Sequence, residues 1–309
     1  MNRICVIFNP TARGERAKRW MPYLRDWERD CELQPTNAPG GARTLASKAV
    51  LGGFETIVAA GGDGTVNEVV NGIADVPGGM HEVRLGVLPM GTINVFAREL
   101  GLSPQPCSAW RTILEGVERP VDLPRATFAA GAGPETRHFI QLAGAGLDAR
   151  AVELVSWELK KKLGMMAYIF AALQAYRGES HSVNVEFNGI RKTGEAVLVG
   201  NGQLYGGNHA VFHRARLDDG LLDVLMLKRV SALTLAQAGL AVLTGNWSRL
   251  KGVDCFQLAE FQASGATRTP LELDGEHAGV LPAHFRMGTH QTRVLAPLRQ
   301  AGRHGTLRP

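Results

Sequence analysis

The sequence predicts an α/β protein of two domains, in which a doubly wound parallel sheet is followed by a mainly antiparallel β-sandwich. At 309 residues, the chain exceeds what one hydrophobic core usually fills. Its first part alternates short apolar runs with segments of helical periodicity, and its later part is dominated by strand-like runs. The content of 45% hydrophobic and 20% charged residues is ordinary for a globular protein and argues against disorder.

The first domain is predicted from three apolar runs that have the length of buried strands. They are Ile4–Phe8, Thr56–Ala60 and Leu85–Leu88, and a segment with helical spacing of apolar residues follows each of them. A repeated β-α-β-α order indicates a parallel sheet with helices on both faces. Ligands bind such sheets at the carboxyl ends of the strands, so we expect a binding site there.

The pattern changes at about Arg125. Strand-like runs follow at Ala196–Val199, Leu221–Leu227, Cys255–Phe261, Pro270–Leu273 and His284–Met287. Helical inserts are expected near Ala149–Leu159, Met165–Tyr176 and Leu233–Leu243. We therefore predict a first domain over residues 1–124 and a β-rich second domain over residues 125–291, and we place residues 292–309 with the first domain.

Charge and targeting signals narrow the class of protein. The formal net charge of +5 is compatible with an anionic membrane surface or phosphorylated ligands. No basic run is interleaved with aromatic residues, so we expect no nucleic-acid partner. The chain has neither a signal h-region nor an apolar stretch near the roughly 20 residues of a membrane-spanning helix, which predicts a cytoplasmic protein.

The glycine-rich segment Gly61–Thr65 (GGDGT) is the strongest functional signal. It follows a buried strand, and a helix is expected to begin just after Thr65. Such a turn brings backbone N–H groups and the helix dipole close to a phosphate, and Asp63 at its tip could hold Mg²⁺ or polarise a nucleophile. The alternative is a plain turn with Asp63 or Thr65 as the helix cap. The doubled glycine and its place at the sheet edge favour phosphate binding, although the chain has no P-loop sequence.

Five segments in this order resemble the diacylglycerol kinase catalytic-domain family, which includes sphingosine kinases and bacterial lipid kinases. The segments are Asn9–Gly14, Gly61–Thr65, Leu88–Ala97, Leu217–Val224 and Leu273–Glu276. The resemblance implies ATP- and Mg²⁺-dependent transfer of a phosphoryl group to a hydroxyl of a membrane lipid, by a protein peripheral to the inner face of the membrane. Glu276 would be the general base, and Asp63 would act near the phosphates and the catalytic Mg²⁺.

The resemblance also implies two sets of binding residues. A structural Mg²⁺ would be bound by the carboxylate of Asp219 and the carbonyls of Arg216 and Leu221, with waters completing the ligands. Without the resemblance, both acidic turns, Asp218–Gly220 and Asp274–Glu276, are typical of hairpin turns between strands. The residues expected around the nucleotide are Asn9, Thr36, Gly61, Gly62, Asp63, Gly64, Thr65, Asn67 and Thr92.

Some positions depart from the family pattern. Val95 stands where many bacterial relatives have Asp, Tyr205–Asn208 replaces a more glycine-rich run, and His213 stands where proline is common. These changes are compatible with an altered acceptor preference or with weakened catalysis. The family aspartate at the domain junction corresponds to Asp122, for which a structural and a catalytic role are both open.

Membrane access and the identity of the acceptor are the remaining questions. The basic triplet Lys160–Lys162 precedes an apolar segment, which either packs into the second domain or brings the lysines to anionic head groups, at about 1 kcal/mol each. Two other functions are weighed: a soluble-substrate kinase similar to NAD kinases, which share the GGDGT loop, and a nucleotide-binding regulator without turnover. Diacylglycerol, a long-chain base, phosphatidylglycerol and a prenol remain candidate acceptors, and a homo-oligomer is compatible with the sequence.

Overall fold

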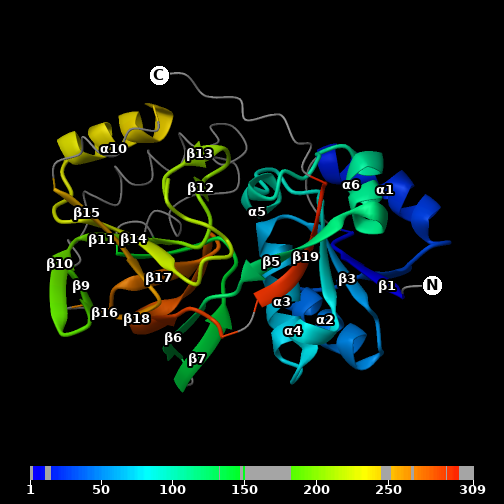
Figure 1. Cartoon of the computed structure of the whole chain (residues 1–309), viewed down its shortest axis with the longest axis horizontal. Helices are drawn as coiled ribbons and strands as arrows, with labels where there is room; N and C mark the ends of the chain where they lie inside the picture. The colour runs from blue at the N-terminus through cyan, green and yellow to red at the C-terminus, as the bar shows by residue number, and fades with distance from the viewer. Residues whose placement is uncertain are drawn as a thin grey trace.

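The computed structural model describes residues 3–10, 15–131, 133–146, 149, 182–244, 252–265, 268–289 and 291–298. Its strands form two large sheets and a separate two-stranded hairpin (Figure 1). The first is a mostly parallel sheet covered by helices, and the second is antiparallel. The predicted fold class, a doubly wound α/β domain followed by a mainly antiparallel β domain, is confirmed.

The first sheet has six strands in the order β2-β1-β3-β4-β19-β5. Neighbouring strands run parallel except β5, which pairs antiparallel with β19. Strand β19 comes from the end of the described chain and lies between β4 and β5, so the chain returns to its first sheet. The strands are β1 (Ile4–Phe8), β2 (Glu32–Pro35), β3 (Thr56–Gly61), β4 (Arg84–Pro89), β5 (Val117–Asp122) and β19 (Gln291–Ala296).

Helices cover both faces of this sheet because successive strand residues point to opposite sides. In β1, Cys5 and Ile7 belong to the core beneath α2 (Gly41–Leu51) and α3 (Asp63–Ala74). The alternate residues of β1 belong to the core beneath α1 (Glu15–Trp27) and α6 (Pro106–Glu115), where the rings of Trp27 and Trp110 stack at 4.6 Å. Two short helices, α4 (Gly79–Glu82) and α5 (Val95–Glu99), flank β4 in sequence.

The second sheet follows the order β10-β9-β16-β18-β17-β8-β11-β14-β15, with β6 paired to β18 and β7 paired to β6. Its core contains the rings of Phe139, Phe261 and Phe285, the last two stacked at 4.7 Å. A small hairpin, β12 (Leu204–Tyr205) and β13 (His209–Ala210), and helix α10 (Ala232–Thr244) complete the described part. The strands are β6 (Arg125–Ala130), β7 (Gly133–His138), β8 (Leu142–Gly146), β9 (Val183–Phe187), β10 (Ile190–Gly194), β11 (Ala196–Gly200), β14 (Leu222–Leu227), β15 (Val253–Leu258), β16 (Glu260–Gly265), β17 (Pro270–Leu273) and β18 (Glu276–Arg286).

Two details differ from the expectations. The run Cys255–Phe261 is divided between two strands, because the extended conformation is interrupted at Ala259. The carbonyl of Ala259 accepts the N–H of Met287 at 2.7 Å. Helix α3 begins at Asp63, two residues before Thr65. The inserts expected near Ala149–Leu159 and Met165–Tyr176, with the Lys160–Lys162 triplet between them, lie outside the described residues, except for Ala149. None of the described helices is long and apolar enough to cross a membrane.

Candidate active site between the two domains

The GGDGT turn presents the open end of a helix. Strand β3 ends at Gly61, Gly62 is the extended N-cap, and the first intrahelical hydrogen bond runs from the N–H of Val66 to the carbonyl of Gly62 at 3.1 Å. The N–H groups of the turn before Val66 therefore point out of the helix end. Such an end favours a bound anion because the helix dipole adds to these N–H groups.

Glu276 of the second domain lies directly against this turn. It begins β18, and its Oε1 is so close to the α-carbon of Gly64 that a methyl group at position 64 would overlap with it. Gly64 has an ordinary backbone conformation, so it is the close approach of Glu276, and not the backbone angle, that favours glycine here. The segments Gly61–Thr65 and Leu273–Glu276, which are far apart in the sequence, therefore lie next to each other in the structure.

A cavity of about 590 Å³ opens between Glu276 and the turn. Five of the nine residues expected around the nucleotide line it: Asn9, Thr36, Gly62, Gly64 and Thr65. Gly61 is buried at the end of β3, beneath the side chain of Thr65. Thr92 is exposed on the loop after β4 and does not line the cavity.

Asp63 faces a second, smaller cavity, which is also lined by Gly275, the residue before Glu276. Its Oδ1 accepts the N–H of Phe96 at 3.2 Å, so the carboxylate caps helix α5. Burial raises the pKa of Asp63, and the N–H groups of Val95 and Phe96 oppose that rise. The cavity holds about 60 Å³. Its exposed wall is largely apolar and includes Ile93, Val95, Ile140, Leu142, Tyr205 and Gly206, with Asp63, Glu272 and Asp274 as acids.

Asp274 joins the two domains. Its Oδ1 accepts the N–H groups of Gln141 (2.9 Å) and Leu142 (3.1 Å), and its Oδ2 accepts the N–H of Ile140 (2.9 Å) and the amide of Asn67 (2.7 Å). The alternative prediction for this position was a solvent-exposed hairpin turn. The turn does join β17 to β18, with a left-handed φ of 50° at Asp274, but the carboxylate is buried.

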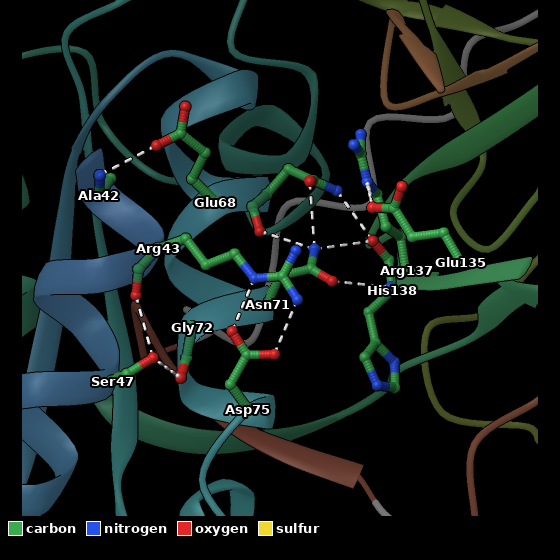
Figure 2. A network of polar contacts seen from close by, with 11 residues as sticks. Ala42, Arg43, Ser47, Glu68, Asn71, Gly72, Asp75, Glu135, Arg137 and His138 are labelled. Carbon is green, nitrogen blue, oxygen red and sulfur yellow. Dashed lines mark hydrogen bonds and ion pairs between the residues drawn. The ribbon is translucent and has the colours of Figure 1, made fainter. Parts of the chain in front are cut away.

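Asn67 lies in this junction and not in the lining of the larger cavity. Its amide also donates to the carbonyl of His138 at 3.0 Å, and Asn71, one turn later in α3, exchanges hydrogen bonds with the same backbone at 2.9 and 3.0 Å. Figure 2 shows Asn71 and His138 facing each other between α3 and β7. The figure also shows Glu68 of α3, whose carboxylate accepts the N–H of Ala42 at the start of α2 at 2.9 Å.

We expect Asp274→Asn to lower the free energy of unfolding by about 2–4 kcal/mol, measured by chemical denaturation at pH 7. Burial raises the pKa of Asp274 to about 6, opposed by its N–H donors, so the group is mainly ionised at pH 7. An amide would place an NH₂ group against buried N–H donors and leave them without an acceptor. The control is Asp75→Asn, which removes an exposed ion pair with Arg43 and should cost less than about 1 kcal/mol. An equal, small effect of both changes would contradict the assigned role of Asp274.

The acidic loop after β13 also bridges the domains. Asp219 Oδ1 accepts the N–H of Leu221 at 3.1 Å, while Asp122, at the end of β5, accepts the N–H of Gly220 at 2.7 Å and the amide of Gln291 at 2.8 Å. Burial raises the pKa of Asp219, and the carboxylates of Asp122 and Asp218 raise it further. A cation at this loop would relieve this repulsion. The described residues contain no cluster of three or more His, Cys, Asp or Glu that could hold a metal, so backbone carbonyls such as those of Arg216 and Leu221 would be needed.

Comparison with known proteins decides the family. A diacylglycerol kinase from Bacillus subtilis (strain 168) is 30% identical over 309 residues, covering 97% of this chain and 98% of that protein. The chain belongs to the diacylglycerol kinase family. A diacylglycerol kinase from Staphylococcus aureus (strain MRSA252) is also 30% identical, over 302 residues, and covers 96% of this chain and 92% of that protein.

Each domain also matches a family model. Residues 3–126 match the diacylglycerol kinase catalytic domain, and residues 141–296 match the YegS C-terminal NAD kinase beta sandwich-like domain. Two solved structures from Bacillus anthracis str. Sterne, described as diacylglycerol kinases, superpose with TM-scores of 0.75 and 0.70. They are 23% and 21% identical, each covering 96% of this chain and 97% of theirs, and at that identity they establish the fold. Membership in this kinase family supports a kinase activity and implies use of a nucleotide.

The sequence analysis missed several residues whose hydrogen bonds connect the elements around the site. Gln141 donates from its amide to Glu99 Oε2 (3.1 Å) and to the carbonyl of Leu204 (2.9 Å), which ties α5 to the β12–β13 hairpin. Asn71 could have been found from the sequence, because it is a polar residue within the apolar stripe of α3. In the structure its side chain is 3% exposed. Nothing local marks Gln141, whose partners are distant in sequence.

Proposed function

We propose that the chain transfers the γ-phosphoryl group of ATP to a hydroxyl of a membrane lipid, with Mg²⁺, as a protein peripheral to the membrane. The observation that supports this most is the close contact between the carboxylate of Glu276 and Gly64. Because of this contact, one cavity contains both a carboxylate from the second domain and a helix end of the first domain that is suited to bind an anion.

In this proposal Glu276 takes the proton of the lipid hydroxyl while the oxygen attacks the γ-phosphorus. The bond from that phosphorus to the bridging oxygen of the β-phosphate breaks, and ADP leaves. An ordinary glutamate has a pKa of about 4.3 and is too weak to ionise an alcohol beforehand, so the proton moves as the new bond forms. The turn N–H groups of Gly62–Thr65 orient the phosphates, and bound Mg²⁺ would neutralise charge on them.

The smaller cavity supports an aliphatic acceptor. It adjoins Asp63, and its exposed surface is mainly apolar, with side chains such as Ile93, Val95 and Leu142. Val95 makes this wall more apolar than the acidic residue of many relatives would. A polar acceptor such as NAD would leave its own polar groups without partners on such a wall.

Transfer of label from [γ-³²P]ATP tests this function against its closest alternative. NAD is the appropriate alternative substrate, because the second domain matches the model of an NAD kinase beta sandwich-like domain. Detergent-dispersed total lipid and NAD would be offered separately, and label counted in the organic and aqueous phases. We expect a labelled lipid and no labelled NADP. Label on NAD alone would replace the proposal with a soluble-substrate kinase, and nucleotide binding without any transfer would favour a regulator.

A metal site at the acidic loop has a readout that does not involve activity. We expect Mg²⁺ to raise the melting temperature of the wild-type protein, because a ligand that binds only the folded state stabilises it. Asp219→Ala should abolish this rise. Asp218→Ala is the matched control, since its carboxylate accepts from Arg216 at 3.2 Å and is not among the proposed ligands. Differential scanning fluorimetry with a Mg²⁺ titration makes the comparison; an equal Mg²⁺ response in wild type and Asp219→Ala would exclude this site.

A further inference from the structure

Helix α10 has an unusual composition for a surface helix. It is capped by Ser231, whose Oγ accepts the N–H of Thr234 at 3.0 Å, and none of its 13 residues is charged. Its exposed residues follow the i, i+3, i+4, i+7 spacing of one helical face. This exposed face of α10 consists of Leu233, Ala236, Gln237 and Leu240.

The two leucines of this face are strongly exposed, Leu233 at 68% and Leu240 at 61%. The outer face of a surface helix normally carries charged and polar side chains, and its apolar stripe faces the core. Here Ala241 is buried on the inner side, yet three of the four residues on the outer side are apolar as well. Neighbouring exposed apolar side chains of this kind mark a surface that contacts something apolar.

The place of α10 connects this surface to the candidate acceptor cavity. Helix α10 packs against β13, and α5 packs against β12, so the β12–β13 hairpin lies between the two helices (Figure 1). The same hairpin contributes Tyr205 and Gly206 to the cavity beside Asp63. The exposed face of α10 is therefore one hairpin away from the place where an acceptor would enter.

The charges around α10 identify the partner. Lys228 and Arg229 directly precede the helix and are exposed; Lys228 pairs with Asp254 at 2.8 Å. Apolar side chains beside basic ones complement an anionic lipid surface, at about 1 kcal/mol for each basic residue near it. A second copy would instead bring like charges together across a two-fold contact.

We infer that the exposed face of α10 docks the protein on the surface of an anionic bilayer, with the helix axis in the plane of the interface. A helix of 13 residues is about 20 Å long, less than the roughly 30 Å hydrocarbon layer, so α10 lies in the interface and does not span it. The inference rests on the proposed function only in that the docked surface would deliver a lipid acceptor to the cavity beside Asp63.

Co-sedimentation with vesicles, without nucleotide, tests the docking. The vesicles are phosphatidylcholine alone or mixed with phosphatidylglycerol, and the variant is Leu233→Gln with Leu240→Gln. We expect the wild type to prefer the anionic vesicles, and the variant to bind them at least about tenfold more weakly, because two leucines no longer enter the interface. Leu51→Gln, at a leucine of α2 that is 76% exposed, is the matched control and should bind like the wild type. Thermal melting by circular dichroism verifies that all variants are folded.

Two further measurements separate the possible failures. With a short-chain, water-soluble acceptor, the α10 variant should turn over like the wild type, while on vesicles it should be slower. Unchanged vesicle binding by the variant would overturn the inference, as would a dimer in sedimentation velocity that the variant dissociates without any change in vesicle binding. A wild type that binds vesicles through α10 but phosphorylates no lipid would overturn the proposed function and leave the docking surface standing.

Discussion

Replacing Glu276 by Gln should lower kcat about 10²- to 10⁴-fold and leave the affinity for ATP nearly unchanged, because a positioned general base contributes an effect of this size. Glutamine keeps the size of the side chain and its place against Gly64, but it cannot take the hydroxyl proton. Steady-state transfer of label to the dispersed lipid gives kcat, and equilibrium binding of a fluorescent ATP analogue gives the affinity.

Glu260→Gln is the matched control for this change. Glu260 is on β16 of the same domain, its side chain is half exposed, and its partner His284 lies at 2.7 Å on the surface. We expect this variant to keep the turnover of the wild type, since exposed ion pairs contribute little to stability. Near-normal turnover of Glu276→Gln would show that another group accepts the proton.

Gly64→Ala should lower kcat about 10²-fold while stabilising the fold slightly. The added methyl would overlap with Oε1 of Glu276, and because that oxygen ends a flexible side chain, the carboxylate would swing away from the turn. A displacement of about 1 Å at a reacting group can cost a factor of this size. Alanine is favoured over glycine in a helix by about 0.5–1 kcal/mol, so the melting temperature should rise.

This opposition of activity and stability distinguishes a displaced base from a damaged fold. The control is Gly131→Ala, where the added methyl would meet no described atom within 4 Å. It should change neither kcat nor the melting temperature appreciably. Full activity of Gly64→Ala would mean that the contact between Glu276 and the turn has no part in transfer.

The fold was largely predictable because its strands carry local signals. The runs Ile4–Phe8 and Thr56–Ala60 are apolar on both faces, as strands buried between two helical layers must be, and both form strands of the first sheet. The β9–β10 hairpin escaped prediction although Asn188 and Gly189 carry the turn signal, with left-handed φ values of 48° and 75°. Strand β10, which follows this turn, is mostly exposed and polar, so its hydrophobic pattern is weak.

The candidate site was predictable only where glycine and acidic residues form compact motifs. Gly62, Gly64 and Thr65 line the larger cavity as the turn chemistry suggested. The side chain of Asn67 could not be placed, because its partners Asp274 and His138 lie far along the chain and are brought close by packing of the two domains. The start of α3 at Asp63 was missed for a related reason: glycine at position 64 lowers the helix propensity of a turn whose geometry the tertiary structure fixes.

A crystal structure with a non-hydrolysable ATP analogue and Mg²⁺ would test the shared cavity most directly. We predict its phosphates within hydrogen-bond distance of the backbone N–H groups of Gly62–Thr65, and its terminal phosphate next to the carboxylate of Glu276. Phosphates bound away from this turn, or a Glu276 side chain directed to the outer surface with the analogue in place, would contradict the account.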